Sequence, residues 1–197
     1  MNRLVVSSLV VAAAMALLAS PASAQDRPKP RATANKVTLG VAVGYGFRVT
    51  DEGNLDSDAN PYGVGLGLRA GYTLDAGIYL GALSQFFAGT RVGNDTVSGR
   101  IYQMNLAAEV GYDLKLGDNL VLRPSVAIGS TVSLGERCVL GRCTSDHTDP
   151  FLLVAPAATL IVSMGKVYVA AEARYFYLPD DAIPDGLLLG GNVGVLL

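Results

Sequence analysis

Apolar residues alternate with small or polar ones along several segments of this 197-residue chain. The pattern is clearest from Val37 to Val49, where Val, Leu, Tyr and Phe stand at every second position and mostly Thr, Gly and Ala lie between them. It recurs from Tyr62 to Leu74 and from Tyr102 to Asp113. A period of two residues is typical of a β-strand whose two faces meet different surroundings, so the chain is expected to fold as a sheet.

Eight such segments are expected, although two of them, Gly77–Thr90 and Phe151–Ser163, alternate only weakly. The expected strands are residues 37–49, 62–74, 77–90, 102–113, 119–134, 151–163, 167–178 and 186–197. The connections between them alternate in length. The short ones are residues 75–76, 115–118 and 164–166, and the long ones are residues 50–60, 91–99, 135–149 and 179–185. An even number of strands with short turns on one side and long loops on the other is typical of bacterial transmembrane β-barrels.

The composition supports a membrane location, because 50% of the residues are hydrophobic and only 16% are charged. Beyond residue 24, the longest apolar stretch is Phe151–Val162, which is interrupted by Pro156. A membrane-spanning helix needs about 20 apolar residues. In lipid, strands can satisfy all their backbone hydrogen bonds only in a closed barrel. The expected fold is therefore all-β, an eight-stranded antiparallel up-and-down transmembrane β-barrel.

The first 24 residues are typical of a secretory signal peptide. Arg3 precedes an apolar run from Leu4 to Leu18, and the segment ends in Ala22-Ser23-Ala24, which is an A-x-A cleavage site. We expect cleavage between Ala24 and Gln25. Residues 25–36 are then a flexible periplasmic lead, residues 37–197 form the barrel, and the exported protein is located in the outer membrane.

Charged residues indicate which face of the strands meets lipid. All of them lie on the face that carries the small and polar residues: Arg48, Arg69, Glu109, Asp113, Arg123, Glu172 and Arg174. A lipid-facing Arg at mid-bilayer costs roughly 2 to 4 kcal/mol, so this segregation favours lipid on the apolar face over a soluble carrier with an apolar interior. Aromatic girdles are expected from the pairs Tyr62/Tyr72 and Tyr102/Tyr112, joined on the outer side by Tyr45, Phe47, Tyr175 and Tyr177.

From Val37 onward the chain resembles the small eight-stranded outer-membrane barrels of the OmpA/OmpX type. It departs from them at its end, Asn192–Leu197, which lacks the usual terminal aromatic residue. The resemblance implies outer-membrane lipid and the barrel-assembly machinery as partners. It favours a non-enzymatic role in envelope integrity or surface contact, with adhesion as one example. The alternatives are an enzyme that modifies lipid A and a small-solute channel.

No catalytic, cofactor or metal site is expected from the sequence. His147 is the single histidine and falls in a long loop, so it is interpreted as an exposed loop residue. Asp56–Asn60 resembles the start of a calcium loop, but Pro61 and Gly67 stand where the turn Gly and the closing Glu belong. A solvated acidic loop is the better interpretation.

The expected outer loops hold eleven acidic residues against three arginines, a net charge of −8. Such loops favour divalent cations or basic surface partners, and the chain offers nothing basic enough to favour nucleic acid. Two cysteines, Cys138 and Cys143, lie in the third long loop. An exported chain meets an oxidising compartment, so a disulfide between them is expected.

Five inward charged residues are expected to form an ion network that closes the lumen: Arg69, Glu109, Arg123, Glu172 and Arg174. Buried charges need partners. If the turn at residues 115–118 pairs Asp113 with Asn119, Glu109 lies opposite Arg123. Glu172 and Arg174, two residues apart on one face, could reach Arg69 across the lumen.

The signal-peptide interpretation predicts that the mature protein begins at Gln25. N-terminal sequencing of the membrane-inserted protein tests this prediction. A chain that still begins with Met1 would contradict it.

Overall fold

The computed structural model describes residues 32–50, 60–93, 97–139, 142–179 and 184–197. Within these ranges, no helix is both long and apolar enough to cross a membrane. The predicted signal peptide, its cleavage site at Ala24 and Gln25, and the calcium-like segment Asp56–Ala59 lie outside the described residues. These interpretations remain predictions.

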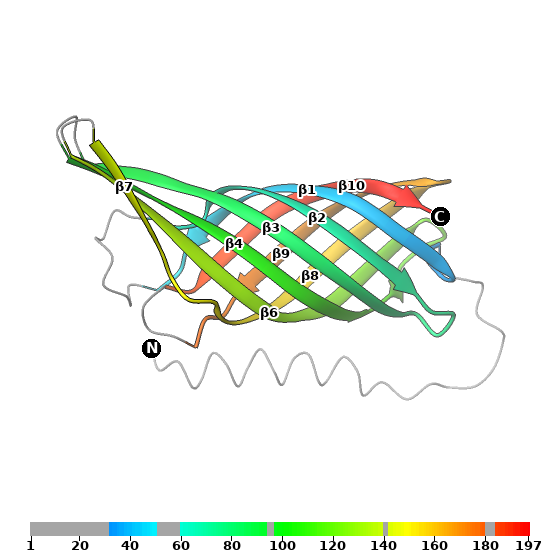
Figure 1. The fold of residues 1–197 in the computed structure, drawn as a ribbon. Helices are drawn as coiled ribbons and strands as arrows, with labels where there is room; N and C mark the ends of the chain where they lie inside the picture. Colours follow the sequence, from blue (N-terminus) through cyan, green and yellow to red (C-terminus); the bar gives the residue numbers. More distant parts are fainter. Residues whose placement is uncertain (1–31, 51–59, 94–96, 140–141, 180–183) are drawn as a thin grey trace. The chain divides into compact units, whose positions relative to one another are not determined.

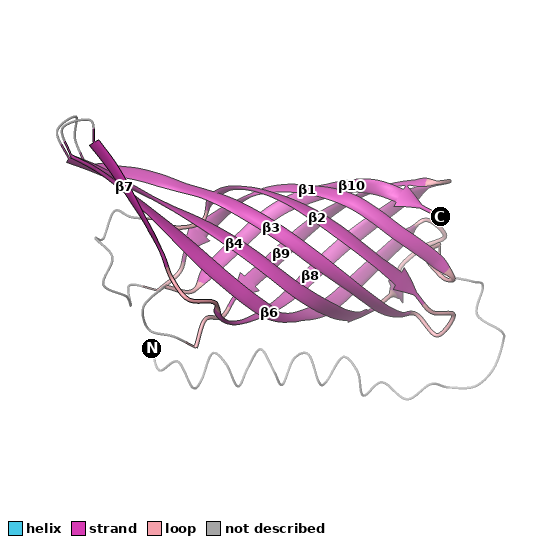
Figure 2. Ribbon diagram, viewed as in Figure 1, coloured by secondary structure: helices cyan, strands magenta, loops and turns pink. Residues whose placement is uncertain are grey.

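The described chain forms ten strands, eight of which make up a closed antiparallel barrel (Figures 1 and 2). The barrel strands are β1 (Lys36–Arg48), β2 (Gly63–Thr73), β3 (Ile78–Gly93), β4 (Val97–Tyr112), β6 (Leu120–Val139), β8 (Phe151–Met164), β9 (Val167–Phe176) and β10 (Gly186–Leu196). Two short strands, β5 (Leu114–Lys115) and β7 (Arg142–His147), pair with β6. The fold class predicted from the alternation is confirmed.

The first and last strands close the barrel. β1 and β10 pair from Thr38↔Leu196 to Arg48↔Gly186, and pairing of β4 with β6 completes the ring. Each barrel strand therefore has a neighbour on both sides, which supplies the backbone partners that lipid cannot offer.

The outer surface of the barrel is apolar, as the alternation predicts. Leu68 is 65% exposed and Leu66 is 58% exposed, and both lie on the face that points away from the lumen. The polar and charged residues of the alternate positions, such as Arg69, are buried inside. This apolar outer surface does not fit the soluble carrier, which would need a polar one.

Two of the three tight turns, near residues 75–76 and 164–166, lie where they were predicted. The turn after β2 and the turn between β8 and β9 each contain a glycine in the left-handed region, Gly77 at φ 88° and Gly165 at φ 67°. Other residue types rarely adopt these angles. This end of the barrel is the periplasmic one, because the short turns of such barrels face the periplasm.

Two of the predicted long loops are mostly strand. β3 continues to Gly93 and β4 begins at Val97, so the loop predicted at residues 91–99 is wrong for most of its length. In the loop predicted at residues 135–149, β6 continues to Val139 and β7 returns antiparallel to it. The ends of β3, β4 and β6, together with β7, extend beyond the rest of the barrel, and we call this part the extension (Figure 1).

The prediction that Tyr62 belongs to the outer girdle is wrong. Tyr62 precedes β2 and is fully buried, whereas Tyr72 is 39% exposed on the outer face. The break comes at Gly63, whose φ of +55° interrupts the extended backbone and reverses the alternation before it. The Tyr62 hydroxyl donates a 2.7 Å hydrogen bond to the carbonyl oxygen of Pro184.

The described part of the predicted flexible lead is folded. Residues 32–35 form a turn, Asn35 adopts a positive φ of 54°, and its side-chain amide donates to the carboxylate of Asp75. Thr33 is fully buried and donates a hydrogen bond to the carboxylate of Asp113. These four residues therefore belong structurally to the barrel and cover part of its periplasmic end.

Candidate functional site

Four charged side chains meet in the middle of the lumen and form a closed ring of ion pairs, which we call the quartet. Arg69 of β2 donates to both carboxylate oxygens of Glu109 on β4, and its Nη1 lies 2.7 Å from Glu172 of β9. Arg174 of β9 completes the ring, 2.8 Å from Glu109 and 2.6 Å from Glu172. Ser125 donates a further 2.7 Å hydrogen bond to Glu109. Positive and negative charges alternate around the ring, so the quartet is neutral.

Arg123 lies outside the quartet, toward the periplasmic end. Its guanidinium binds both carboxylate oxygens of Asp113, at 2.6 and 2.9 Å, and stacks over the ring of Tyr79 at 3.7 Å. Its Nη2 also donates to the hydroxyl of Thr73, 3.2 Å away. Arg123 and Asp113 are both almost completely buried. Their pair is the kind of bidentate contact that compensates two buried charges.

The predicted pair between Glu109 and Arg123 is wrong, because the register of the hairpin differs from the assumed one. Glu109 lies opposite Ala127, and Leu114 lies opposite Leu122. The chain reverses over the residues between Lys115 and Val121, which moves Arg123 opposite Asp113 and leaves Glu109 free to bind Arg69 and Arg174. Asp113 is the residue that the sequence analysis missed in the network. The predicted network had three arginines and only two carboxylates, and this imbalance indicated that a third carboxylate was needed.

An apolar layer fills the lumen on the extracellular side of the quartet. Its aromatic members are Tyr62, Phe87 and Phe176, whose ring centroids lie 5.5 to 5.9 Å apart. The buried side chains of Leu153 and Leu178 belong to the same cluster. This apolar layer explains the weak alternation in residues 77–90 and 151–163. The apolar residues of β3 and β8 point into the lumen as well as toward lipid.

The interior is therefore filled rather than open. A cavity of about 10 Å³ borders the quartet, with Gln85, Glu172 and Asn192 in its lining. That volume accommodates about one water molecule. Eight-stranded barrels are generally just wide enough for their own side chains to fill them. Among the described residues of the lumen, the quartet lies between the apolar layer on one side and the Arg123–Asp113 pair on the other.

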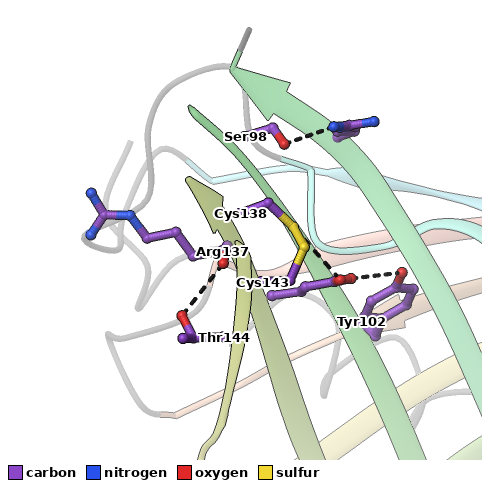
Figure 3. Close-up of a disulfide and its surroundings, with 8 residues drawn as sticks. Ser98, Tyr102, Arg137, Cys138, Cys143 and Thr144 are labelled. Carbon is purple, nitrogen blue, oxygen red and sulfur yellow. Dashed lines mark hydrogen bonds between the residues drawn. A yellow bond between two sulfur atoms is a disulfide. The ribbon is translucent and has the colours of Figure 1, made fainter. Parts of the chain in front are cut away.

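The two cysteines form a disulfide in the extension. Cys138 of β6 and Cys143 of β7 lie opposite each other and are bonded (Figure 3). Glu136 lies close enough to both sulfurs for the three groups to resemble a metal site. The disulfide removes both thiolates, so this grouping offers a single carboxylate and is a poor metal site.

The single histidine lies at the end of β7. His147 is exposed, and its backbone N–H donates a 2.9 Å hydrogen bond to the carboxylate of Asp146. Both residues are exposed, like the rest of β7. This position agrees with its interpretation as an exposed surface residue.

Comparison with solved structures shows the same fold in small outer-membrane barrels. Ail, the attachment invasion locus protein of Yersinia pestis, is 15% identical with a TM-score of 0.53, and the match covers 83% of this chain and 99% of that one. The N-terminal barrel of Pseudomonas aeruginosa OprF is 13% identical with a TM-score of 0.53, covering 83% and 98%. Neisserial surface protein A is 14% identical with a TM-score of 0.50, covering 81% and 95%. None of the curated proteins matches the sequence.

Fold, apolar outer surface and structural neighbours together define an integral β-barrel of the bacterial outer membrane. The autotransporter β-domain family matches residues 27–131, which is more than half of the chain. The chain therefore belongs to the autotransporter β-domain family. The matched segment includes β1 to β4 and the first part of β6.

Replacing Glu109 should destabilise the barrel strongly, because it would leave two buried arginines without their shared carboxylate. We expect Glu109→Gln to cost about 3 to 5 kcal/mol of stability, as is typical when one partner of a buried ion pair is removed. Thermal unfolding in detergent, followed by heat-modifiable gel mobility, measures the change. The control is Asp118→Asn, since Asp118 pairs with Lys115 through a side chain that is 81% exposed. Equal stability of the two variants would contradict a central role for Glu109.

The disulfide predicts that Cys138 and Cys143 are protected from thiol reagents. Intact cells that express the protein should give negligible labelling with a membrane-impermeant maleimide until a reductant is added. Strong labelling before reduction would show that the cysteines are free at the cell surface.

Proposed function

We propose that this protein is a closed, non-enzymatic outer-membrane barrel that makes contacts at the cell surface through its extension. The observation that carries the proposal is the continuation of β3, β4 and β6 beyond the rest of the barrel, joined there by β7 (Figure 1). Paired backbone and a disulfide hold this sheet in one conformation, and a preorganised surface loses little entropy when it binds.

Filling of the lumen supports a surface role over transport. The quartet, the Arg123–Asp113 pair and the apolar layer occupy successive levels of the interior. A solute would have to displace buried ion pairs or closely packed aromatic rings to pass. Ail, one of the structures with this fold, is named for attachment and invasion, which is consistent with surface contact by a small barrel of this kind.

Most of the acidic residues expected to attract divalent cations lie outside the residues that the structure describes. One acidic residue at the extracellular end, Asp185, is buried. Its carboxylate accepts a 2.7 Å hydrogen bond from the Tyr175 hydroxyl and a 3.1 Å hydrogen bond from the Leu178 N–H. Both oxygens of the Asp185 carboxylate are therefore used in hydrogen bonds within the chain. Divalent cations or basic partners at the remaining acidic residues, and recognition by the barrel-assembly machinery, stay predictions.

A closed lumen predicts that the purified protein does not conduct steadily in planar bilayers. A wide porin inserted under the same conditions serves as the positive control. Steady porin-like conductance of the wild type would contradict the closed interior.

Surface contact can be tested by shortening the extension without touching the barrel. Residues 137–144 are replaced by Asn-Gly, because Glu136 and Ser145 lie opposite each other and a two-residue turn can join them. We expect attachment of expressing bacteria to matrix-protein surfaces to fall several-fold, while heat-modifiable mobility persists. The control is Asp118→Asn at the periplasmic turn. Unchanged attachment of a folded, surface-exposed variant would count against the proposal.

A further inference from the structure

Two arginines lie directly opposite each other at the base of the extension. Arg91 of β3 pairs with Arg100 of β4, so both side chains leave the sheet on the same face. Like charges in this relation destabilise a sheet. Within the part of the chain that the structure describes, neither guanidinium forms an ion pair. Arg91 donates a 2.8 Å hydrogen bond to the hydroxyl of Ser98, and Arg100 lies over the ring of Tyr102 at 5.8 Å. The charge of the pair remains available to an anion outside the chain.

The arginine pair lines a hollow of about 300 Å³ on this face of the extension, together with Ser98, Tyr102 and Glu136. The disulfide forms another part of its wall (Figure 3). Glu136 lies opposite Arg100 in the register, but its carboxylate accepts a 3.4 Å hydrogen bond from the Tyr102 hydroxyl. The three charged residues that line the hollow therefore carry a net positive charge.

The hollow lies at the level of the lipid headgroups. Tyr102 stacks on Phe86, which is 43% exposed on the lipid-facing surface, and aromatic residues of this kind mark the membrane interface. Arg100 lies two residues before Tyr102 in β4, on the same face of the sheet and further toward the extracellular side. At about 3.3 Å per residue and a tilt of about 40°, it lies about 5 Å beyond Tyr102 along the membrane normal. The headgroup layer is about 5 to 8 Å thick on each side, so the hollow faces it sideways.

We propose that Arg91 and Arg100 bind a phosphate group on the headgroup of an anionic glycolipid in the outer leaflet. Guanidinium groups bind phosphate in a bidentate geometry, and two of them on one face can hold a single phosphate from both sides. The ring of Tyr102 and the disulfide offer apolar surface to the sugar that carries the phosphate. This binding site is independent of the proposed surface contacts, because it requires only that the barrel sits in the outer membrane.

The extension supplies its own matched control. Arg137 and Arg142 lie on the other face of the same sheet, since they alternate with Glu136, Cys138 and Cys143 along β6 and β7. Figure 3 shows the Arg137 side chain pointing away from the disulfide. Arg137→Gln/Arg142→Gln removes the same charge as Arg91→Gln/Arg100→Gln but leaves the hollow intact.

Native mass spectrometry of the folded full-length mature chain in detergent, titrated with diphosphoryl lipid A or with its dephosphorylated form, tests the proposal. The wild type should bind the diphosphoryl form about 25-fold more tightly, since each of the two arginines near an anionic lipid surface contributes about fivefold. Arg91→Gln/Arg100→Gln should lose this preference, and Arg137→Gln/Arg142→Gln should keep it within about twofold. Heat-modifiable gel mobility establishes that each variant is folded, and the single variants Arg91→Gln and Arg100→Gln replace the double variant if it does not fold.

Three results would overturn the proposal. One is an unchanged preference in Arg91→Gln/Arg100→Gln, and another is an equal loss in both double variants, which would indicate general charge attraction. The third comes from a soluble polyanion, sucrose octasulfate. If the wild type binds it through Arg91 and Arg100 yet shows no preference between the two lipid A forms, the site recognises a soluble anion instead of a lipid.

Discussion

Backbone hydrogen bonding in lipid is the constraint on which the rest of this structure depends. An unpaired strand edge inside a bilayer would leave N–H and C=O groups without partners, so the sheet has to close on itself. Pairing of β1 with β10 over eleven residue positions meets that requirement. Once eight strands are closed, the interior has a fixed and narrow width. Its contents must fill that width and satisfy one another.

Lipid imposes a simple rule on the outer face, and for this reason the sequence was most informative there. The strands, their outward faces and the inward charges could all be predicted from alternation around residues such as Leu68 and Arg69. The interior follows no comparable rule. Its extracellular half contains an apolar cluster in which Tyr62, Phe87 and Phe176 pack together, and this cluster weakens the alternation of two strands.

Local backbone conformation explains the predictions that were wrong. A single left-handed residue, Gly63, turns Tyr62 from the lipid face into the lumen. A turn that lies two residues further along the chain than expected shifts Arg123 from Glu109 to Asp113. The polar strands of the extension resemble loops in sequence, because whether such residues form strands depends on the neighbours with which they pair. Each of these outcomes is set by contacts that are distant in the sequence.

The quartet has a consequence for the order in which the barrel can be assembled. It consists of two neutral halves, Arg69 with Glu109 from the N-terminal strands and Glu172 with Arg174 from β9. Each half can neutralise itself before the two ends of the chain meet, so a partly formed sheet need not bring an uncompensated charge of the quartet into the membrane. Two further ion pairs, Arg69 with Glu172 and Arg174 with Glu109, form only when the halves face each other across the lumen. These two ion pairs stabilise the closed barrel and are absent from any intermediate in which the sheet is still open.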